Sequence, residues 1–541
     1  MTPGFPFFAV GTRFAYILGR PTNPLSKKLN GGNTMNDNKK AASSEASALE
    51  LDFVPAEKRT SWTAAAAVFA GCDLNIPIIF VGAYLAQGLK FGWAFLIMIL
   101  GVTAAQIYSS INAAVGADVG RPGAQLARCS FGSATSRTLI SFLLLYMNMG
   151  WYGSHVQVAA NAGLAAFGVD YSATGNYWIF AVVTVVIGLL FVIPALKGQA
   201  LMAKISKILV PLVCVVFAYA IYRVFQNLGG FSAGLKALIE SEPTTPISIT
   251  NALVMVFGCS ACQWLMFSDY SRYNPRILPD SISAPFVGNI IVCSIIYGIG
   301  IILSTTSGTY DIVAIMSNEL GMGTLAMLCV LIAQMTTMVV AAYSCGLAMA
   351  NMFNIKTQRG QMVSTIVAAT CGTVFSLAGI IGWLDTFLQS LAILYAPVGI
   401  IIAVDHYIIR DRKWNNNSGV NWIALASMAI ACVAATVVSV GYSCFTAMFL
   451  AAALYLAGMM IQAKIKPGKY TPEKWAEGKF TFTKQQKVFI FGCMGGIFVS
   501  FISPFLMPSP MCDAITLAGC AITLVSFIVS VKGHTILGGR K

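Results

Sequence analysis

Long apolar runs separated by short polar turns repeat along almost the whole chain. Each run has roughly the 20 residues that an α-helix needs to cross a hydrocarbon core about 30 Å thick. The pattern therefore predicts an all-α polytopic membrane protein with twelve core transmembrane helices and two extra C-terminal ones. The predicted spans are 62–86, 91–115, 138–168, 176–195, 205–225, 248–268, 284–305, 323–353, 361–382, 383–409, 420–440, 442–462, 488–506 and 512–531.

Polar segments divide the chain further. Residues 1–60 predict a cytoplasmic N-terminal tail, whose short apolar pieces are too interrupted by proline, glycine and arginine for a signal peptide. Met35 opens a stretch typical of a cytoplasmic amino terminus, so we expect translation to start there. Residues 463–487 carry seven lysines and two prolines and predict a cytoplasmic linker before helices 13 and 14 at 488–531. Residues 532–541 then form a cytoplasmic tail.

Composition and charge support this layout. Apolar residues make up 57% of the chain and charged residues 10%, against about a quarter charged in soluble domains, which leaves no room for a sizeable soluble catalytic domain. If the amino terminus is inside, cytoplasmic segments hold 31 of the 34 basic residues, and only Lys90, Arg223 and Lys236 lie outside. This bias predicts a multi-pass protein of the cell membrane with both termini cytoplasmic. The net charge of +14 therefore reflects topology, and we expect no nucleic acid partner.

Two predicted spans contain residues that interrupt a helix. The first contains the run GCDLNIP at 71–77, and the sixth contains GCSACQ at 258–263. Interrupted helices expose backbone groups that hydrocarbon cannot satisfy, so they are tolerated where they line a polar cavity. Interruptions at corresponding positions of two halves indicate an inverted-repeat transporter with its substrate site at the unwound backbone. The alternative is that proline and glycine only kink packed helices.

Asp73 is the residue in these runs that most strongly indicates a functional site. An ionised aspartate at the bilayer centre costs about 2.5–3.5 kcal/mol on insertion scales. It should therefore face a cavity, pair with a cation or remain protonated, and we interpret it as a cation-binding or coupling residue. Asp385 and Asp405 lie toward the ends of the tenth span, where water reaches them, and we interpret both as structural.

The third span carries a pair of aromatic side chains on one helical face. Trp151 and His155 are four residues apart, so the indole and the imidazole lie side by side. Such a face suits a flat heteroaromatic ligand. The alternatives are an interfacial or packing tryptophan and a hydrogen-bonded core histidine.

The eighth span carries Gln334, Thr336 and Thr337 in an otherwise apolar helix. Hydroxyl oxygens are hard ligands that suit Na⁺, especially beside carbonyls freed from an unwound neighbour. The alternative is that each threonine hydroxyl bonds the carbonyl one turn back.

Other chemistry is not indicated. There is no Gly-Lys pair followed by Ser or Thr, so we expect no ATP-driven step in this chain. The Cys259-x-x-Cys262 spacing has no second Cys or His cluster in the sequence, and we interpret it as packing. A membrane-embedded enzyme would need a recognisable acid/base or nucleophile set, which Asp73 and His155 do not make. We expect no cofactor.

Five motifs, taken in order, resemble the nucleobase:cation symporter-1 family, and within it the cytosine permease branch. The similarity covers residues 61–462. The motifs are GADVGRPGAQLARCSFG (116–132), GWY (150–152), SDYSRY (268–273), TTMVVAAYSCGLAMAN (336–351), and APVGIIIAVDHYIIRDRKW (396–414) with VNW (420–422) after it.

The resemblance implies a LeuT-type fold of two inverted five-helix repeats, at 61–225 and 248–409, with helices 11 and 12 at 420–462. It implies import of a nucleobase or related ring of the cytosine or purine type, driven by Na⁺ or H⁺ through alternating access. A cation-coupled carrier of another small organic solute, such as an amino acid, is the alternative.

The same resemblance assigns residues to the two sites. Trp151 falls where family members stack an aromatic on the ring, His155 one turn on, and Ser260 and Cys262 on the unwound sixth span. The cation site falls at Gly71, Asn75, Thr336 and Thr337, with Ala333 adjacent. Asn75, Gln263 and Gln334 are further candidates for the ring's polar edges.

The chain also departs from the family pattern. Ser260 stands where a Trp or Phe usually covers the second face of the ring, so that face would fall to Trp264 or Phe257. Asp73 is foreign to the cytosine permease pattern.

Overall fold

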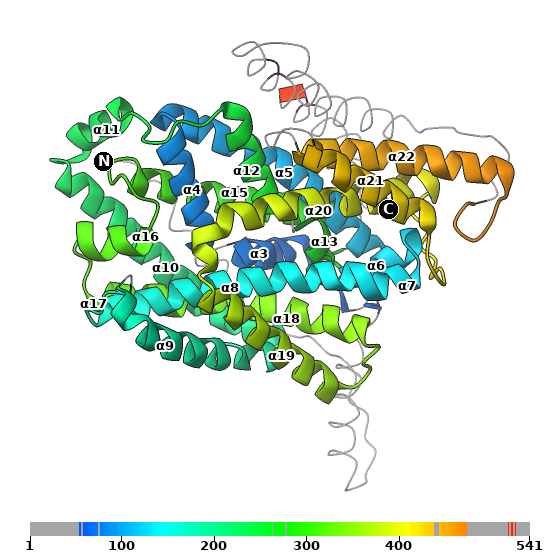
Figure 1. The fold of residues 1–541 in the computed structure, drawn as a ribbon, viewed down its shortest axis with the longest axis horizontal. Coiled ribbons are helices and arrows are strands. Elements are labelled where there is room, and N and C mark those ends of the chain that lie inside the picture. The colour runs from blue at the N-terminus through cyan, green and yellow to red at the C-terminus, as the bar shows by residue number, and fades with distance from the viewer. Residues whose placement is uncertain are drawn as a thin grey trace, which may run out of the picture. The chain divides into compact units, whose positions relative to one another are not determined.

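The computed structural model describes residues 53–55, 58–73, 76–171, 173–197, 199–261, 263–275, 278–437 and 443–472, and the single positions 515, 518, 521, 522 and 525. The regular elements of these residues are helical (Figure 1). They are α3 (Trp62–Asp73), α4 (Ile76–Gly88), α5 (Phe91–Val119), α6 (Gly123–Ser130), α7 (Ser133–Thr135), η3 (Ser136–Ile140), α8 (Ser141–Ala166), η4 (Thr174–Asn176), α9 (Tyr177–Leu190), η5 (Ile193–Lys197), α10 (Gln199–Asn227), α11 (Phe231–Glu240), α12 (Ile249–Ala261), α13 (Gln263–Met266), α14 (Ser268–Ser271), α15 (Leu278–Ser304), α16 (Ile312–Ala314), η6 (Ile315–Glu319), α17 (Thr324–Ala333), α18 (Met335–Met352), α19 (Gln358–Leu377), η7 (Ile380–Trp383), α20 (Leu384–Val404), η8 (Asp405–Ile409), α21 (Trp422–Val437) and α22 (Ser443–Ile465).

Helices occupy each predicted span from the first to the twelfth. Within the described residues, eight helices are long and apolar enough to cross a membrane, or nine if α10 and α11 are counted as one span bent by 86°. The amphipathic helix α11 was not predicted, because its apolar face is short and lies in a polar loop. Predicted helices 13 and 14 lie outside the described residues except at the five single positions.

Small residues let the helices of the first and seventh spans approach closely. A Cβ on Gly82 or Gly300 would strike a backbone carbonyl of the partner helix, that of Tyr297 on α15 or Ile79 on α4. Such contacts are typical of membrane helices, where close packing and not hydrophobicity holds helices together. The α4 part of the first span is therefore held against α15.

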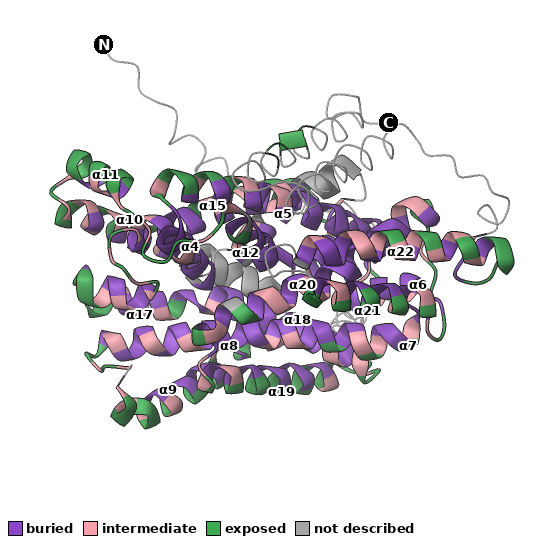
Figure 2. Ribbon diagram, turned by 45° about the horizontal axis from the view of Figure 1, so that its top comes forward, coloured by how far each residue is buried: buried purple, intermediate pink, exposed green. Residues whose placement is uncertain are grey.

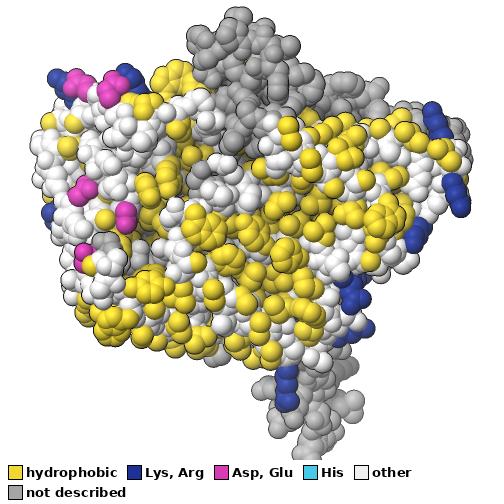
Figure 3. All heavy atoms as spheres, viewed as in Figure 1, with side chains coloured by type: hydrophobic (Ala, Val, Ile, Leu, Met, Phe, Trp, Pro, Cys, Tyr) yellow, Lys and Arg dark blue, Asp and Glu magenta, His cyan; other side chains and the backbone are white. Residues whose placement is uncertain are grey.

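Burial separates inner helices from outer ones. Most residues of α8 and α18 are buried, whereas α9 and α19 expose apolar side chains (Figure 2). Exposed apolar side chains cover much of the face in Figure 3. Charged side chains lie mostly at its edges: Lys and Arg at one, and Asp and Glu, with some Lys and Arg, at the opposite one. This distribution suits a protein whose flank contacts lipid.

Two buried acidic residues tie down the end of the tenth span. Asp118 at the end of α5 accepts hydrogen bonds from Arg412 and from His406, the latter at 3.1 Å. Asp405 pairs with Arg410 at 3.0 Å and accepts a bond of 2.8 Å from the Tyr455 hydroxyl. Hydrogen bonding to Asp118 raises the pKa of the Arg412 guanidinium, which keeps this clamp charged. The side chain of Asp385 lies outside the described residues.

Candidate functional site

The predicted interruptions of the first and sixth spans fall on residues that the structure does not describe. The described part of α3 reaches Asp73 and that of α4 starts at Ile76, while Ala261 of α12 and Gln263 of α13 lie on either side of position 262. Two of the predicted site residues, Asn75 and Cys262, therefore lie outside the described residues. Asp73 and Gln263, which are 190 positions apart in sequence, are in direct contact.

Asp73 is buried in a network of neutral hydrogen-bond donors. Both of its carboxylate oxygens accept from Gln263 Nε2, at 2.8 and 2.9 Å, and Oδ2 also accepts from the Cys293 thiol at 3.2 Å. Gln263 Oε1 in turn accepts from Gln106 Nε2 at 2.8 Å, and Gln106 Oε1 accepts from Asn289 Nδ2 at 3.2 Å. Among the described residues Asp73 has no ion pair. The donors therefore run in one direction, from α15 through α5 and α13 to the carboxylate.

Sequence reasoning missed three members of this network, Gln106, Asn289 and Cys293. Gln106 lies on α5, and Asn289 and Cys293 lie one turn apart on α15. The signal that could have found Gln106 and Asn289 is an amide side chain inside a membrane span, since such groups bury a polar atom that needs a partner.

Trp151 and His155 lie on one face of α8, as predicted from their spacing. His155 is fully buried, and its Nδ1 lies 2.8 Å from Gln334 Oε1. His155 Nε2 and Trp151 Nε1 are also buried, and neither has a hydrogen-bond partner among the described residues. Two ring nitrogens of adjacent turns are thus left without partners, although buried polar atoms are normally hydrogen-bonded.

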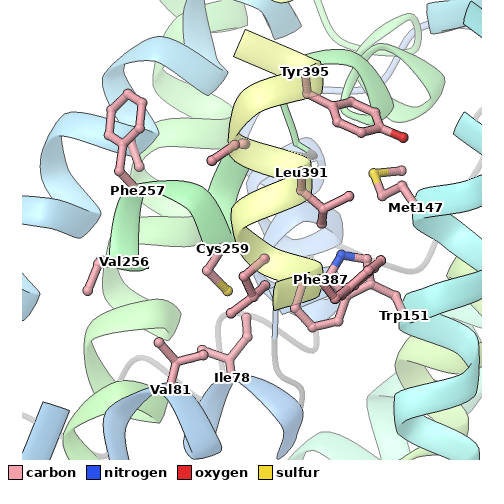
Figure 4. Close-up of a cluster of buried hydrophobic side chains, with 14 of the residues drawn as sticks. Ile78, Val81, Met147, Trp151, Val256, Phe257, Cys259, Phe387, Leu391 and Tyr395 are labelled. Atoms are coloured by element: carbon pink, nitrogen blue, oxygen red, sulfur yellow. The ribbon is translucent and has the colours of Figure 1, made fainter. Parts of the chain in front are cut away.

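The aromatic ring beside Trp151 belongs to Phe387 of α20, which the sequence analysis did not select. The two rings meet edge to face with centroids 5.9 Å apart (Figure 4). Trp264 and Phe257, the candidates for this place, instead pack against each other at 5.1 Å and against Tyr108. Phe387 could have been found as an aromatic residue inside the tenth span. Ser260 is buried on α12.

The candidate cation residues divide between α3 and α18, which contact each other. Gly71 has open space beside it, because a Cβ there would meet nothing within 4 Å. The Thr336 hydroxyl donates to the Ala333 carbonyl at 2.9 Å, as in the alternative interpretation. The Thr337 hydroxyl is buried without a partner among the described residues and so remains available as a ligand.

A cavity of about 360 Å³ lies apart from these residues, among α6, α8, α14 and the end of α18. Its lining includes Gln125, Arg128, Asp269, Asn351 and Lys356. Arg128 Nη2 donates to Asn351 Oδ1 across it, so one hydrogen bond links α6 to α18 at the cavity.

A family of permeases for cytosine/purines, uracil, thiamine and allantoin matches residues 53–461 of the chain. The chain belongs to this family. Cytosine permease of Escherichia coli strain K12 is 28% identical over 385 residues, which cover 70% of this chain and 86% of that permease. This permease is thus a multi-pass membrane transporter and not an enzyme.

Solved structures share its fold. Mhp1, a nucleobase-cation-symport-1 family transporter, in a closed conformation with bromovinylhydantoin bound, gives a TM-score of 0.66 at 18% identity, covering 80% of this chain and 98% of Mhp1. A Na⁺-coupled sialic acid symporter gives 0.54 at 12% identity, covering 79% of this permease and 97% of the symporter. The predicted resemblance to the nucleobase:cation symporter-1 family is confirmed.

Proposed function

We propose that this permease imports a nucleobase-like ring of the cytosine or purine type together with Na⁺ or H⁺, by alternating access. The observation that carries the proposal is the buried face of α8, where Trp151 offers a ring plane and two ring nitrogens lack partners. The family and the E. coli cytosine permease support the same class of substrate.

In this proposal the ring stacks on Trp151, and Phe387 holds the indole from its edge. His155 contacts the polar edge of the ring, with Ser260 and Gln334 near it. Asn75, Cys262 and Gln263 remain predicted contacts, although Gln263 is already bonded to Asp73.

The cation would bind beside Gly71, with oxygens from Asn75, Thr336 and Thr337. The space at Gly71 and the free hydroxyl of Thr337 support this placement, and Asp73 supplies a negative charge two residues away. A cation that bridges α3 and α18 would order the broken first span. Such coupling between ion and substrate is commonly worth about 1–3 kcal/mol.

The proposal includes the full predicted layout of twelve core helices plus two, with inverted repeats at 61–225 and 248–409 and both termini cytoplasmic. One edge of the face in Figure 3 carries Lys and Arg without Asp or Glu, which supports this orientation. The cavity lined by Arg128 and Lys356 lies among predicted cytoplasmic segments, where a path to the cytoplasm would open.

The test is uptake of radiolabelled cytosine, adenine, hydantoin and an amino acid mixture into proteoliposomes, with and without a Na⁺ gradient and a pH gradient. Trp151→Ala should weaken apparent affinity for the transported ring about 5- to 150-fold, because stacking of a base on an aromatic is worth about 1–3 kcal/mol. Trp178→Ala is the matched control, since Trp178 on α9 is 67% exposed. Unchanged affinity in Trp151→Ala, or transport of amino acids alone, would overturn the proposal.

A further inference from the structure

His155 has a hydrogen-bonding state that its neighbour dictates. Gln334 Oε1 can only accept, so the 2.8 Å contact with His155 Nδ1 requires the proton to sit on Nδ1. A cationic imidazole buried without an acidic partner is costly, and the described contacts of His155 include none. The neutral ring with its proton on Nδ1 leaves Nε2 as a bare acceptor.

The Gln334 amide is itself held in one orientation. Gln334 lies between α17 and α18, where its backbone N–H donates to the Ile332 carbonyl. Its side-chain Nε2 donates to the Val330 carbonyl, one turn back, at 3.3 Å. Because Nε2 donates there, Oε1 is the atom that faces the imidazole, and an amide flip would set this oxygen against the Val330 carbonyl, so that two acceptors would face each other.

The other nitrogen on this face without a partner among the described residues, Trp151 Nε1, is a hydrogen-bond donor and not an acceptor. Indole Nε1 of Trp151 can only donate, and it lies one helical turn before His155, where side chains four apart are neighbours. Both nitrogens are buried without partners among the described residues. The face thus offers one donor, in the plane of the indole, and one acceptor, on His155, one helical turn apart.

We infer that Gln334 is a positioning residue that fixes the tautomer of His155, so that the site selects rings that present an N–H donor to His155 Nε2. This inference rests on the proposed function and narrows its substrate class to heterocycles with an N–H on the edge that faces His155. Sites built to hydrogen-bond a substrate N–H discriminate strongly against analogues that lack it, because the buried protein group is left unpaired.

The tautomer can be read without transport. In full-length protein labelled with ¹⁵N-histidine, only His155, His406 and His534 contribute, and His155→Gln identifies the signal of interest. We expect protonated Nδ1 and unprotonated Nε2 in the wild type. Gln334→Leu should shift the ring toward a mixture. Gln157→Leu is the control. It removes an amide that lies on the same helix as His155 and accepts from the Ile381 N–H, and it should leave the protonation of the two His155 nitrogens unchanged.

Substrate selection is tested by competition against radiolabelled cytosine uptake with uracil and with 1,3-dimethyluracil, which has no N–H. We expect the dimethyl compound to compete at least tenfold more weakly in the wild type. In Gln334→Leu this ratio should fall at least threefold. A ratio that is the same in Gln334→Leu and wild type would show a merely structural role and overturn the inference.

The two tests separate the two claims. Absence of cytosine uptake in the wild type would count against the proposed function, while the nitrogen signals would still report the tautomer. A proton found on Nε2 in the wild type would overturn the inference even if cytosine is transported.

Discussion

Replacing Gln263 with leucine is expected to destabilise this permease far more than loss of an ordinary buried amide. Gln263 donates to both oxygens of the buried Asp73 carboxylate, at 2.8 and 2.9 Å, and leucine would leave that carboxylate with the weak thiol donor of Cys293. Hydrogen bonds to a charged group contribute about 1.5–3 kcal/mol each, against about 0.5–1.5 kcal/mol for neutral ones, and a buried charge that loses its donors costs more than a neutral group would. Gln106 Nε2 would also lose its acceptor. We expect a loss of about 4 kcal/mol in the free energy of unfolding.

The assay is unfolding of the purified full-length protein in detergent micelles, followed by tryptophan fluorescence. Gln87→Leu is the matched control, because Gln87 is a buried amide that donates only to neutral oxygens of Ser304, at 2.8 Å; we expect it to cost about 1–3 kcal/mol. Adding Asp73→Asn to Gln263→Leu removes the stranded charge and should recover about 2 kcal/mol. The reasoning fails if Gln263→Leu costs no more than Gln87→Leu, or if the two substitutions simply add.

Three further predictions concern packing and the clamp at the end of the tenth span. Phe387→Ala should weaken binding of the transported ring about 2- to 12-fold in Kd, since the edge-to-face contact that holds the indole is worth about 0.5–1.5 kcal/mol; equal Kd values in direct binding would contradict this role. Gly82→Ala should lower the free energy of unfolding by about 1–3 kcal/mol, because its Cβ would strike a backbone carbonyl, whereas Gly92→Ala, with open space around it, should change it by less than about 0.5 kcal/mol. Arg412→Gln should cost about 2 kcal/mol by weakening the pairing of buried Asp118, and a melting temperature equal to that of the wild type would refute it.

Much of the helical layout could be predicted from sequence because hydrocarbon imposes a simple rule: a spanning segment must satisfy its own backbone. The ends of α8, α19 and α22 fall within a few residues of the predicted spans. The rule does not apply to segments outside the bilayer core, which is why α11 was missed. It also says nothing about Val54, Arg59 and Thr60, which belong to the predicted tail. Val54 and Arg59 bond to carbonyls at the C-terminal end of α5, and the Thr60 N–H donates to the Tyr273 carbonyl after α14.

The candidate site was predictable where chemistry and spacing coincide within one helix. Trp151 and His155 share a face because of helical periodicity, and the structure places them so. Phe387 and Gln106 are visible as an aromatic and an amide inside predicted spans, but their partners could not be predicted, because each contacts a residue more than 150 positions away and a single sequence does not reveal such contacts.

Two buried glutamines, Gln263 and Gln334, each contact a candidate site residue through the side-chain amide. Gln263 begins α13 and directs its two N–H groups to Asp73, whereas Gln334 precedes α18 and directs its oxygen to His155. An amide has a donor end and an acceptor end, so neither glutamine can change one contact without disturbing the other. Gln334 also lies between Ala333 and Thr336, the residues that would flank a bound cation. A cation in the proposed site would therefore influence the Gln334 amide, and through it the hydrogen bonding of His155. In this way cation binding would be coupled to binding of the substrate ring.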